Sequence, residues 1–305
     1  MKFLPFTALL LLLVSCSADV DRQARDSQAA FPDNPKIVFQ AALEACAIPE
    51  AKVYADESMK VLWNADDRIS IFNLNTYNWQ FSFEGDDGDT AGGFEPVGEE
   101  DFGADVNYVY AVYPYRTETS LSTDGILTMT LPAEQAYKAH SFGIGATAMV
   151  AVTEGTFQAF KNVGGYLSLR LYGDNVSLSR ITIQGNNKDR IAGKASLSMA
   201  LGGTPVVTMD ASATDAISIV CNPAVKLGAS ADQYTEFWFV IPPVTFSQGF
   251  TISVTDDKGW TYTKSTSKSF TVTRNQLDWM NALKVVPELS SLEPGNNEGI
   301  GHEIW

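Results

Sequence analysis

The residues of this 305-residue chain that could do chemistry are few and widely spaced. Its two histidines, His140 and His302, have no cysteine, histidine or carboxylate partner at the spacing of a zinc site. Cys46 and Cys221 have no neighbouring base that could activate a nucleophilic thiol, and no Gly-x-Ser-x-Gly elbow occurs. We therefore predict no catalytic residue, no metal ligand and no cofactor. Paired carboxylates, which serve glycosidases, stay open as an alternative.

Three further patterns match binding sites loosely. Residues 84–89 and 99–101 are rich in carboxylates that could bind Ca²⁺, but they lack regular ligand spacing, so solvated hairpin tips are the favoured interpretation. Residues 143–148 match GxGxxA, yet a strand pattern follows where a nucleotide-binding helix should begin. Six Trp and eleven Tyr suit sugar binding, but most occupy inward positions of alternating strands, where packing accounts for them.

The N-terminus carries the clearest chemical signal. Lys2 precedes an apolar run from Phe3 to Val14, which is typical of a secretory signal. The following Leu-Val-Ser-Cys resembles the lipobox of bacterial lipoproteins, and this resemblance implies cleavage before Cys16 and acylation of that residue. We predict a signal peptide over residues 1–15 and a lipidated, flexible, polar tether over 16–36, because two or three acyl chains hold a protein at a membrane. An ordinary secretory signal is the alternative.

The charge, length and cysteine content of the chain limit its partners, its number of domains and its disulfides. The formal net charge is -15, so the surface repels phosphate backbones, and nucleic acid is excluded as a partner. A length of about 150 residues per domain suggests two domains. An exported protein could form a disulfide between Cys46 and Cys221, but no spacing supports it, and two unpaired thiols are favoured.

Apolar residues with a period of two dominate the remaining sequence and predict antiparallel strands with one buried face. The runs cover residues 37–43, 79–83, 108–112, 127–131, 167–171, 181–183, 252–254 and 270–272. Many short strands with turn signals between them predict an all-β sandwich or barrel. Residues 256–259 are predicted to form a hairpin turn, and a short helix is predicted over 275–283. The pattern pauses near residue 155, where we place a domain boundary.

Seven short motifs resemble fimbrillin-like proteins in the order that this family shows. They are residues 63–72 (WNADDRISIF), 110–115 (YAVYPY), 131–135 (LPAEQ), 160–167 (FKNVGGYL), 181–186 (ITIQGN), 239–243 (FVIPP) and 249–252 (GFTI). The resemblance implies two tandem transthyretin-like β-sandwich domains, here residues 37–154 and 155–286, followed by a polar tail at 287–305. It also implies a lipid-anchored place on the outer membrane, within type V pili, and no enzymatic activity.

The resemblance further implies assembly by strand exchange. In this family, stalk subunits lose an N-terminal strand by cleavage after an arginine, and the groove then accepts a strand of another pilin subunit, which is β-strand addition. This chain has no arginine between Arg25 and Arg68. We therefore expect the strand at 37–43 to stay in place and the tail at 287–305 to make few buried contacts.

An anchor or an accessory tip adhesin is accordingly favoured over a stalk subunit. A host or bacterial surface receptor is an open partner. The alternative function is that of a surface glycan-binding lipoprotein in a nutrient-uptake system. Residues 89–91 (DTA) resemble a short O-glycosylation sequon, which would place a glycan on Thr90.

Overall fold

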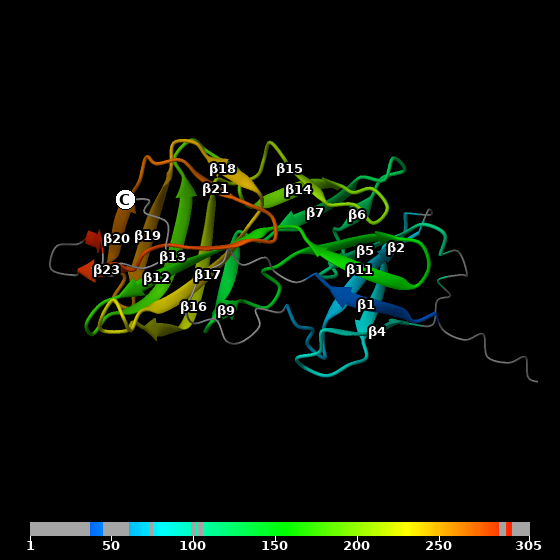
Figure 1. The fold of residues 1–305 in the computed structure, drawn as a ribbon, viewed down its shortest axis with the longest axis horizontal. Coiled ribbons are helices and arrows are strands. Elements are labelled where there is room, and N and C mark those ends of the chain that lie inside the picture. Colours follow the sequence, from blue (N-terminus) through cyan, green and yellow to red (C-terminus); the bar gives the residue numbers. More distant parts are fainter. Residues whose placement is uncertain are drawn as a thin grey trace, which may run out of the picture. The chain divides into compact units, whose positions relative to one another are not determined.

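The computed structural model describes residues 37–44, 61–73, 76–98, 102, 106–286 and 291–294. Every regular element in these ranges is a β-strand, so they contain no helix that could span a membrane (Figure 1). The predicted all-β class is confirmed. The predicted signal peptide, the lipidation site Cys16 and the tether at 16–36 lie outside these ranges.

Seven strands close into a barrel in the order β1-β11-β10-β5-β2-β3-β4. The barrel strands are β1 (Phe39–Leu43), β2 (Arg68–Phe72), β3 (Trp79–Phe83), β4 (Ala91–Pro96), β5 (Val109–Tyr113), β10 (Met149–Thr153) and β11 (Phe157–Asn162). The barrel is filled mainly by aromatic rings. The indole of Trp63 lies 5.0 to 5.8 Å from the ring centroids of Phe83, Phe94, Tyr113 and Phe160.

A four-stranded sheet covers the outer side of β5 and β10. Its strands, in spatial order, are β15 (Val206–Met209), β14 (Gly193–Ser198), β7 (Leu127–Leu131) and β6 (Ser120–Leu121). Val109 and Ala111 of β5 point into the barrel, whereas Tyr110 and Val112 pack against this sheet. Because both faces of β5 are covered, its sequence VYAVY contains no charged residue.

The largest sheet is built mainly from the second half of the chain. Its strands are β8 (Glu134–Lys138), β9 (Ser141–Phe142), β12 (Gly165–Tyr172), β13 (Ser177–Gly185), β16 (Ala216–Lys226), β17 (Thr235–Ile241), β19 (Phe250–Asp256), β20 (Thr261–Ser265), β22 (Leu277–Trp279), β23 (Leu283–Val286) and β24 (Ser291–Pro294). Strands β18 (Val244–Phe246) and β21 (Phe270–Val272) form a separate pair. The hairpin predicted at 256–259 is confirmed, since it joins the antiparallel strands β19 and β20.

One edge of this sheet is closed by a side chain. The amide of Gln135 donates from Nε2 to the Val240 carbonyl at 2.8 Å and accepts from the Val240 N–H at 3.0 Å. The side chain thereby makes the two hydrogen bonds that a neighbouring strand would make with β17. Gln135 is buried, so these bonds satisfy polar groups that water does not reach.

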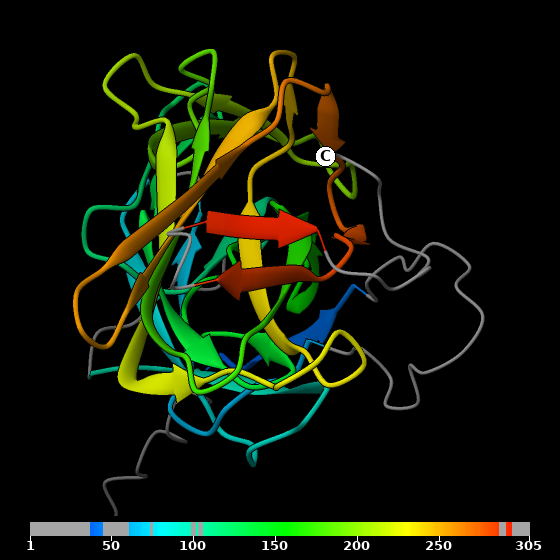
Figure 2. The same ribbon diagram turned by 90° about the vertical axis from the view of Figure 1, so that its left-hand side faces the viewer.

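The C-terminal region differs from the sequence expectation in two places. The helix predicted over 275–283 is absent, because Asn275 has a φ of 58° and the chain continues as β22, whose Leu277 pairs in parallel with Tyr166. Residues 291–294, within the stretch 287–305 that was expected to be a flexible polar tail, form β24. That strand lies antiparallel beside β23 and makes one parallel bridge to β20, so it completes the sheet (Figure 2).

The arrangement as two β-sandwiches is not confirmed, because β1 pairs on both sides and closes a barrel. Strands before residue 155 also pair with strands after it: β1 with β11, β7 with β14, and β8 with β16. A domain boundary near residue 155 therefore stays a prediction.

The barrel-closing strand as candidate functional site

Strand β1 is held between two strands that are distant from it in sequence. On one side Phe39 to Ala42 pair antiparallel with β4, and on the other Gln40 to Leu43 pair in parallel with β11. The N–H of Gln40 donates to the Thr156 carbonyl at 2.8 Å. Without β1, both β4 and β11 would become edge strands with unpaired backbone groups.

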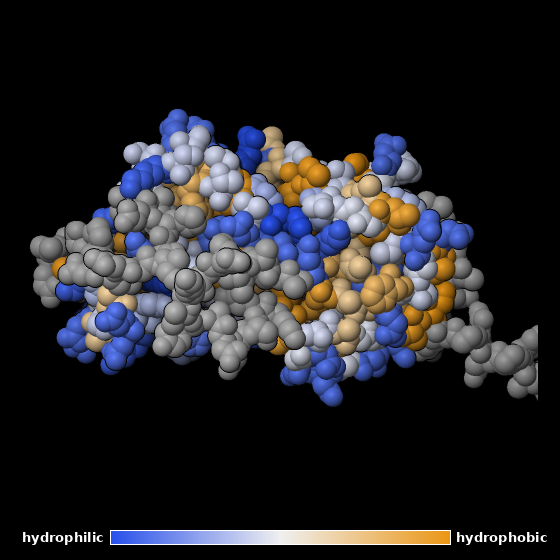
Figure 3. Space-filling model, viewed as in Figure 1, coloured by the Kyte–Doolittle hydropathy of each residue, from blue (hydrophilic) through white to orange (hydrophobic). Residues whose placement is uncertain are grey.

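The side chains of β1 alternate between the barrel interior and its surface. Phe39 and Ala41 point inward and are fully buried, whereas Gln40 is exposed. The ring of Phe39 packs edge to face against Phe81 and Phe102, with centroids 5.1 and 5.5 Å apart. Around the outer side of β1 and β11, apolar residues reach the surface of the face shown in Figure 3, and Phe157 is 56% exposed.

An ion pair fixes the C-terminal end of β1. Nη1 of Arg274 lies 2.6 Å from Oε2 of Glu44, and Nη2 lies 2.9 Å from Oε1, so the guanidinium binds the carboxylate with both nitrogens. The same carboxylate accepts the N–H of Asn162 at 3.0 Å, and Arg274 also donates to the Asn162 carbonyl at 2.9 Å. Paired geometry of this kind is among the stronger polar contacts in proteins.

The geometry can hold an extended strand through three kinds of contact. Backbone hydrogen bonds run along both sides, apolar side chains fill alternate positions, and the Glu44–Arg274 ion pair fixes one end. The first two are the contacts by which a sheet binds an added strand. Register is specified because a shift by one residue would turn Phe39 to the surface.

Other predicted site residues are scattered. Thr90 is exposed next to β4, which leaves its hydroxyl accessible. His140 has a φ of 56° in the turn between β8 and β9, and His302 and Cys46 lie outside the described ranges. Cys221 is a free thiol in the core, and its burial raises the pKa from 9.0 to about 12.

Two of the acidic residues at 84–89 accept hydrogen bonds from backbone N–H groups. Oδ1 of Asp87 accepts the N–H of Ala65 at 2.8 Å, and Oδ2 of Asp89 accepts the N–H of Asp86 at 3.0 Å. Within the described ranges, no group of three or more histidine, cysteine or carboxylate side chains is placed to hold a metal ion. Residues 99–101 lie outside them.

Sequence reasoning identified β1 but missed what holds its end. Glu44 and Arg274 are 230 residues apart, and neither belongs to a local motif. No pattern in a single sequence marks such a pair, because it depends on how distant strands pack.

No protein-family model matches the sequence, and no curated protein matches it. Solved structures with a similar outline include a protein from Bacteroides ovatus provisionally described as a cell adhesion protein, at 14% identity and a TM-score of 0.48, covering 86% of this chain and 98% of that one. A fimbrial protein from Bacteroides ovatus is 12% identical with a TM-score of 0.30, and the match covers 87% of this chain and 55% of that one. The tip fimbrial protein from Porphyromonas gingivalis is 11% identical with a TM-score of 0.32, and the match covers 82% of this chain and 96% of that one. The likeness is too distant to assign a role to this chain.

Proposed function

We propose that this protein is a non-enzymatic subunit of type V pili, held at the outer membrane by lipid on Cys16. Its place in the pilus is that of an anchor or an accessory tip adhesin rather than a repeating stalk subunit. The proposal is supported by the sequence resemblance to fimbrillin-like proteins and by one structural observation: β1 occupies and closes its own barrel.

A stalk subunit of this family must lose its N-terminal strand, and β1 is poorly placed to be lost. Phe39 is fully buried, and the Glu44–Arg274 ion pair holds the end of the strand. The first arginine after β1 is Arg68, which begins β2 and whose carbonyl accepts the N–H of Tyr115 at 2.8 Å. A protease needs an extended and accessible segment, and this backbone is already paired.

An arginine-specific protease tests the proposal. The chain from residue 16, carrying Cys16→Ala, should lose only residues before Ile37 and should stay a monomer by size-exclusion chromatography with light scattering. Ala47→Arg, which places an arginine just after β1, is the control that shows whether the protease can act there. Removal of β1 from the parent chain, followed by ladder-forming oligomers, would make it a stalk subunit instead.

The finer features of the family belong to the same proposal. They are two tandem transthyretin-like domains meeting near residue 155, and attachment to other pilin subunits by strand addition. Limited proteolysis should cut first in the turn at residues 154–156, between β10 and β11, if these domains are separate folding units. First cuts elsewhere in the barrel would argue against the boundary. The reason is that β11, which lies beyond residue 155, closes the barrel by pairing with β1, so a boundary at 155 would separate β11 from the rest of the barrel.

A further inference from the structure

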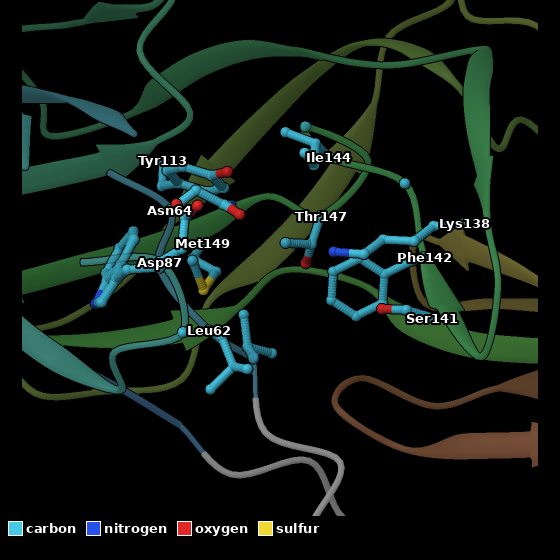
Figure 4. Close-up of a pocket in the computed structure, with 15 residues that line it drawn as sticks. Leu62, Asn64, Asp87, Tyr113, Lys138, Ser141, Phe142, Ile144, Thr147 and Met149 are labelled. Atoms are coloured by element: carbon cyan, nitrogen blue, oxygen red, sulfur yellow. The ribbon is translucent and has the colours of Figure 1, made fainter. Parts of the chain in front are cut away.

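A cavity of about 410 Å³ lies beside the barrel, between residues 61–64 and the segment that runs from β8 to β10. In Figure 4, Asn64, Asp87 and Tyr113 lie on one side, Lys138, Ser141 and Phe142 lie on the other, and Thr147 projects between them. Its volume falls within the range of about 300–1,000 Å³ that is typical of small-ligand sites. The cavity does not involve β1.

The apolar part of the lining includes an aromatic ring, that of Phe142. The ring of Phe142 is stacked on Tyr166 at 5.2 Å with an interplanar angle of 15°, so one of its faces is covered and its orientation is fixed. Phe142 itself lines the cavity, together with Leu62 and Ile144, whose side chains are 46% and 68% exposed. Apolar side chains so exposed around a hollow are suited to a ligand that covers them.

The polar part of the lining is mixed in character. It combines one cation, Lys138, one carboxylate, Asp87, and the neutral groups of Asn64 and Ser141. Charges of opposite sign stand on opposite sides, so the site as a whole favours neither an anion nor a cation. Hydrogen-bond donors and acceptors around an aromatic ring suit a neutral ligand with several hydroxyl groups and one apolar face.

One buried hydroxyl in the cavity has no partner. Thr147 is only 3% exposed, and its Oγ1 makes no hydrogen bond to any described residue. The indole N–H of Trp63, a residue that also lines the cavity, lacks a partner among them as well. Leaving a buried hydroxyl unsatisfied is unfavourable, and a ligand hydroxyl would satisfy it.

We propose that this cavity binds a single pyranose unit of a glycan. The apolar C–H face of the sugar would stack on Phe142, because an aromatic face is electron-rich and attracts weakly positive C–H groups. The sugar hydroxyls would bond to Thr147, Ser141, Asn64 and Lys138. This site goes beyond the proposed pilus role, and it does not depend on assembly with other subunits.

The test begins with the full mature chain, carrying Cys16→Ala, on an array of immobilised glycans. The terminal monosaccharide of the glycan that binds most strongly is then titrated into the protein in a calorimeter. The parent chain should show saturable binding at one site. Thr147→Val, which keeps the shape of the side chain but removes the hydroxyl, should bind about tenfold more weakly. Lys138→Met should weaken binding to a similar extent.

Thr119 supplies a matched control. It is 2% exposed and its hydroxyl also lacks a partner in the described part of the chain, but it does not line the cavity. Thr119→Val and Thr147→Val should both leave the Tm unchanged or raise it, whereas only Thr147→Val should weaken binding. The proposal is overturned if no glycan binds, if free amino acids bind in place of sugars, or if both valine variants behave alike in titration. A negative result leaves the assembly proposal standing, because protease treatment tests that separately.

Discussion

At the scale of single residues, the Glu44–Arg274 ion pair is the contact whose removal should be most informative. Its side chains are only 24% and 19% exposed, and the carboxylate makes three hydrogen bonds. We expect Glu44→Ala to lower the free energy of unfolding by about 1–3 kcal/mol, because Arg274 and the Asn162 N–H lose their partner in a partly buried place. Urea denaturation measures this.

The exposed pair Arg180–Glu134 is the matched control. It is as short, at 2.6 Å, but its side chains are 42% and 64% exposed. Glu134→Ala should therefore cost only about 0–1 kcal/mol. Equal effects of the two substitutions would mean that the end of β1 is not held by Glu44.

Because of the Cys221 thiol, the free energy of unfolding should fall at alkaline pH. Because burial raises its pKa from 9.0 to about 12, the folded chain keeps a proton that the unfolded chain releases. The stabilisation is complete below about pH 9 and is lost as the pH rises toward 12. Cys221→Ala should show a smaller fall in urea midpoint than the parent between pH 8.5 and 10.5. Parallel curves for the two proteins would contradict the assignment.

At the scale of elements, the C-terminal strand makes a prediction that differs from the sequence expectation. Residues Leu283 to Val286 of β23 pair along their whole length with β24. Deleting residues 287–305 should lower stability by about 2 kcal/mol, and the Tm by about 4–8 °C, because the edge of β23 loses its hydrogen bonds. Deleting only residues 295–305, which leaves β24 intact, is the control, and its Tm by calorimetry should match that of the parent.

The sequence predicted the elements better than their partners. Period-two alternation located β3, β7, β19 and β21, because each has one face in a core. The spacing of Leu277, Met280 and Leu283 indicated a helix, yet Leu277 and Met280 pack into different core clusters in an extended chain. Closure of a barrel depends on pairing between β1 and β11, which no local pattern encodes.

The two candidate sites, β1 and the cavity, also differ in how far a local sequence pattern could predict them. The position of β1 could be predicted, because Phe39 and Ala41 alternate with polar or partly exposed residues. The cavity could not, since Thr147 and Phe142 line it only because the turn after β8 brings them beside residues 61–64. The glycines at 143 and 145 match a loose nucleotide-binding pattern in the sequence, and in the structure they line this cavity.

At the scale of the whole molecule, the proposed attachment to the membrane depends on one residue, Cys16, which would carry the lipid. Cys16→Ala should abolish incorporation of labelled palmitate and move the protein from the detergent phase to the aqueous phase. Cys46→Ala is the matched control and should behave like the parent. Equal labelling of Cys16→Ala and the parent would exclude lipidation at this residue.

The parallel pairing of β1 with β11 also has a kinetic consequence. Gln40 and Phe157 are more than 100 residues apart in sequence, so β1 reaches its second neighbour only after a long loop has closed. Contacts between distant segments form slowly, because the loop entropy is lost before the contact is gained. Completion of the barrel should therefore be a late step of folding.

Until that step, the position of β1 is vacant, and a free strand of suitable sequence can compete for it. A labelled peptide of residues 37–44 should be retained by the protein when it is added at the start of refolding from urea, but not when it is added afterwards. Retention at both times would mean that β1 exchanges freely in the folded state. Under the expected result, the period in which this chain can accept a foreign strand ends with its own folding, without any proteolytic signal.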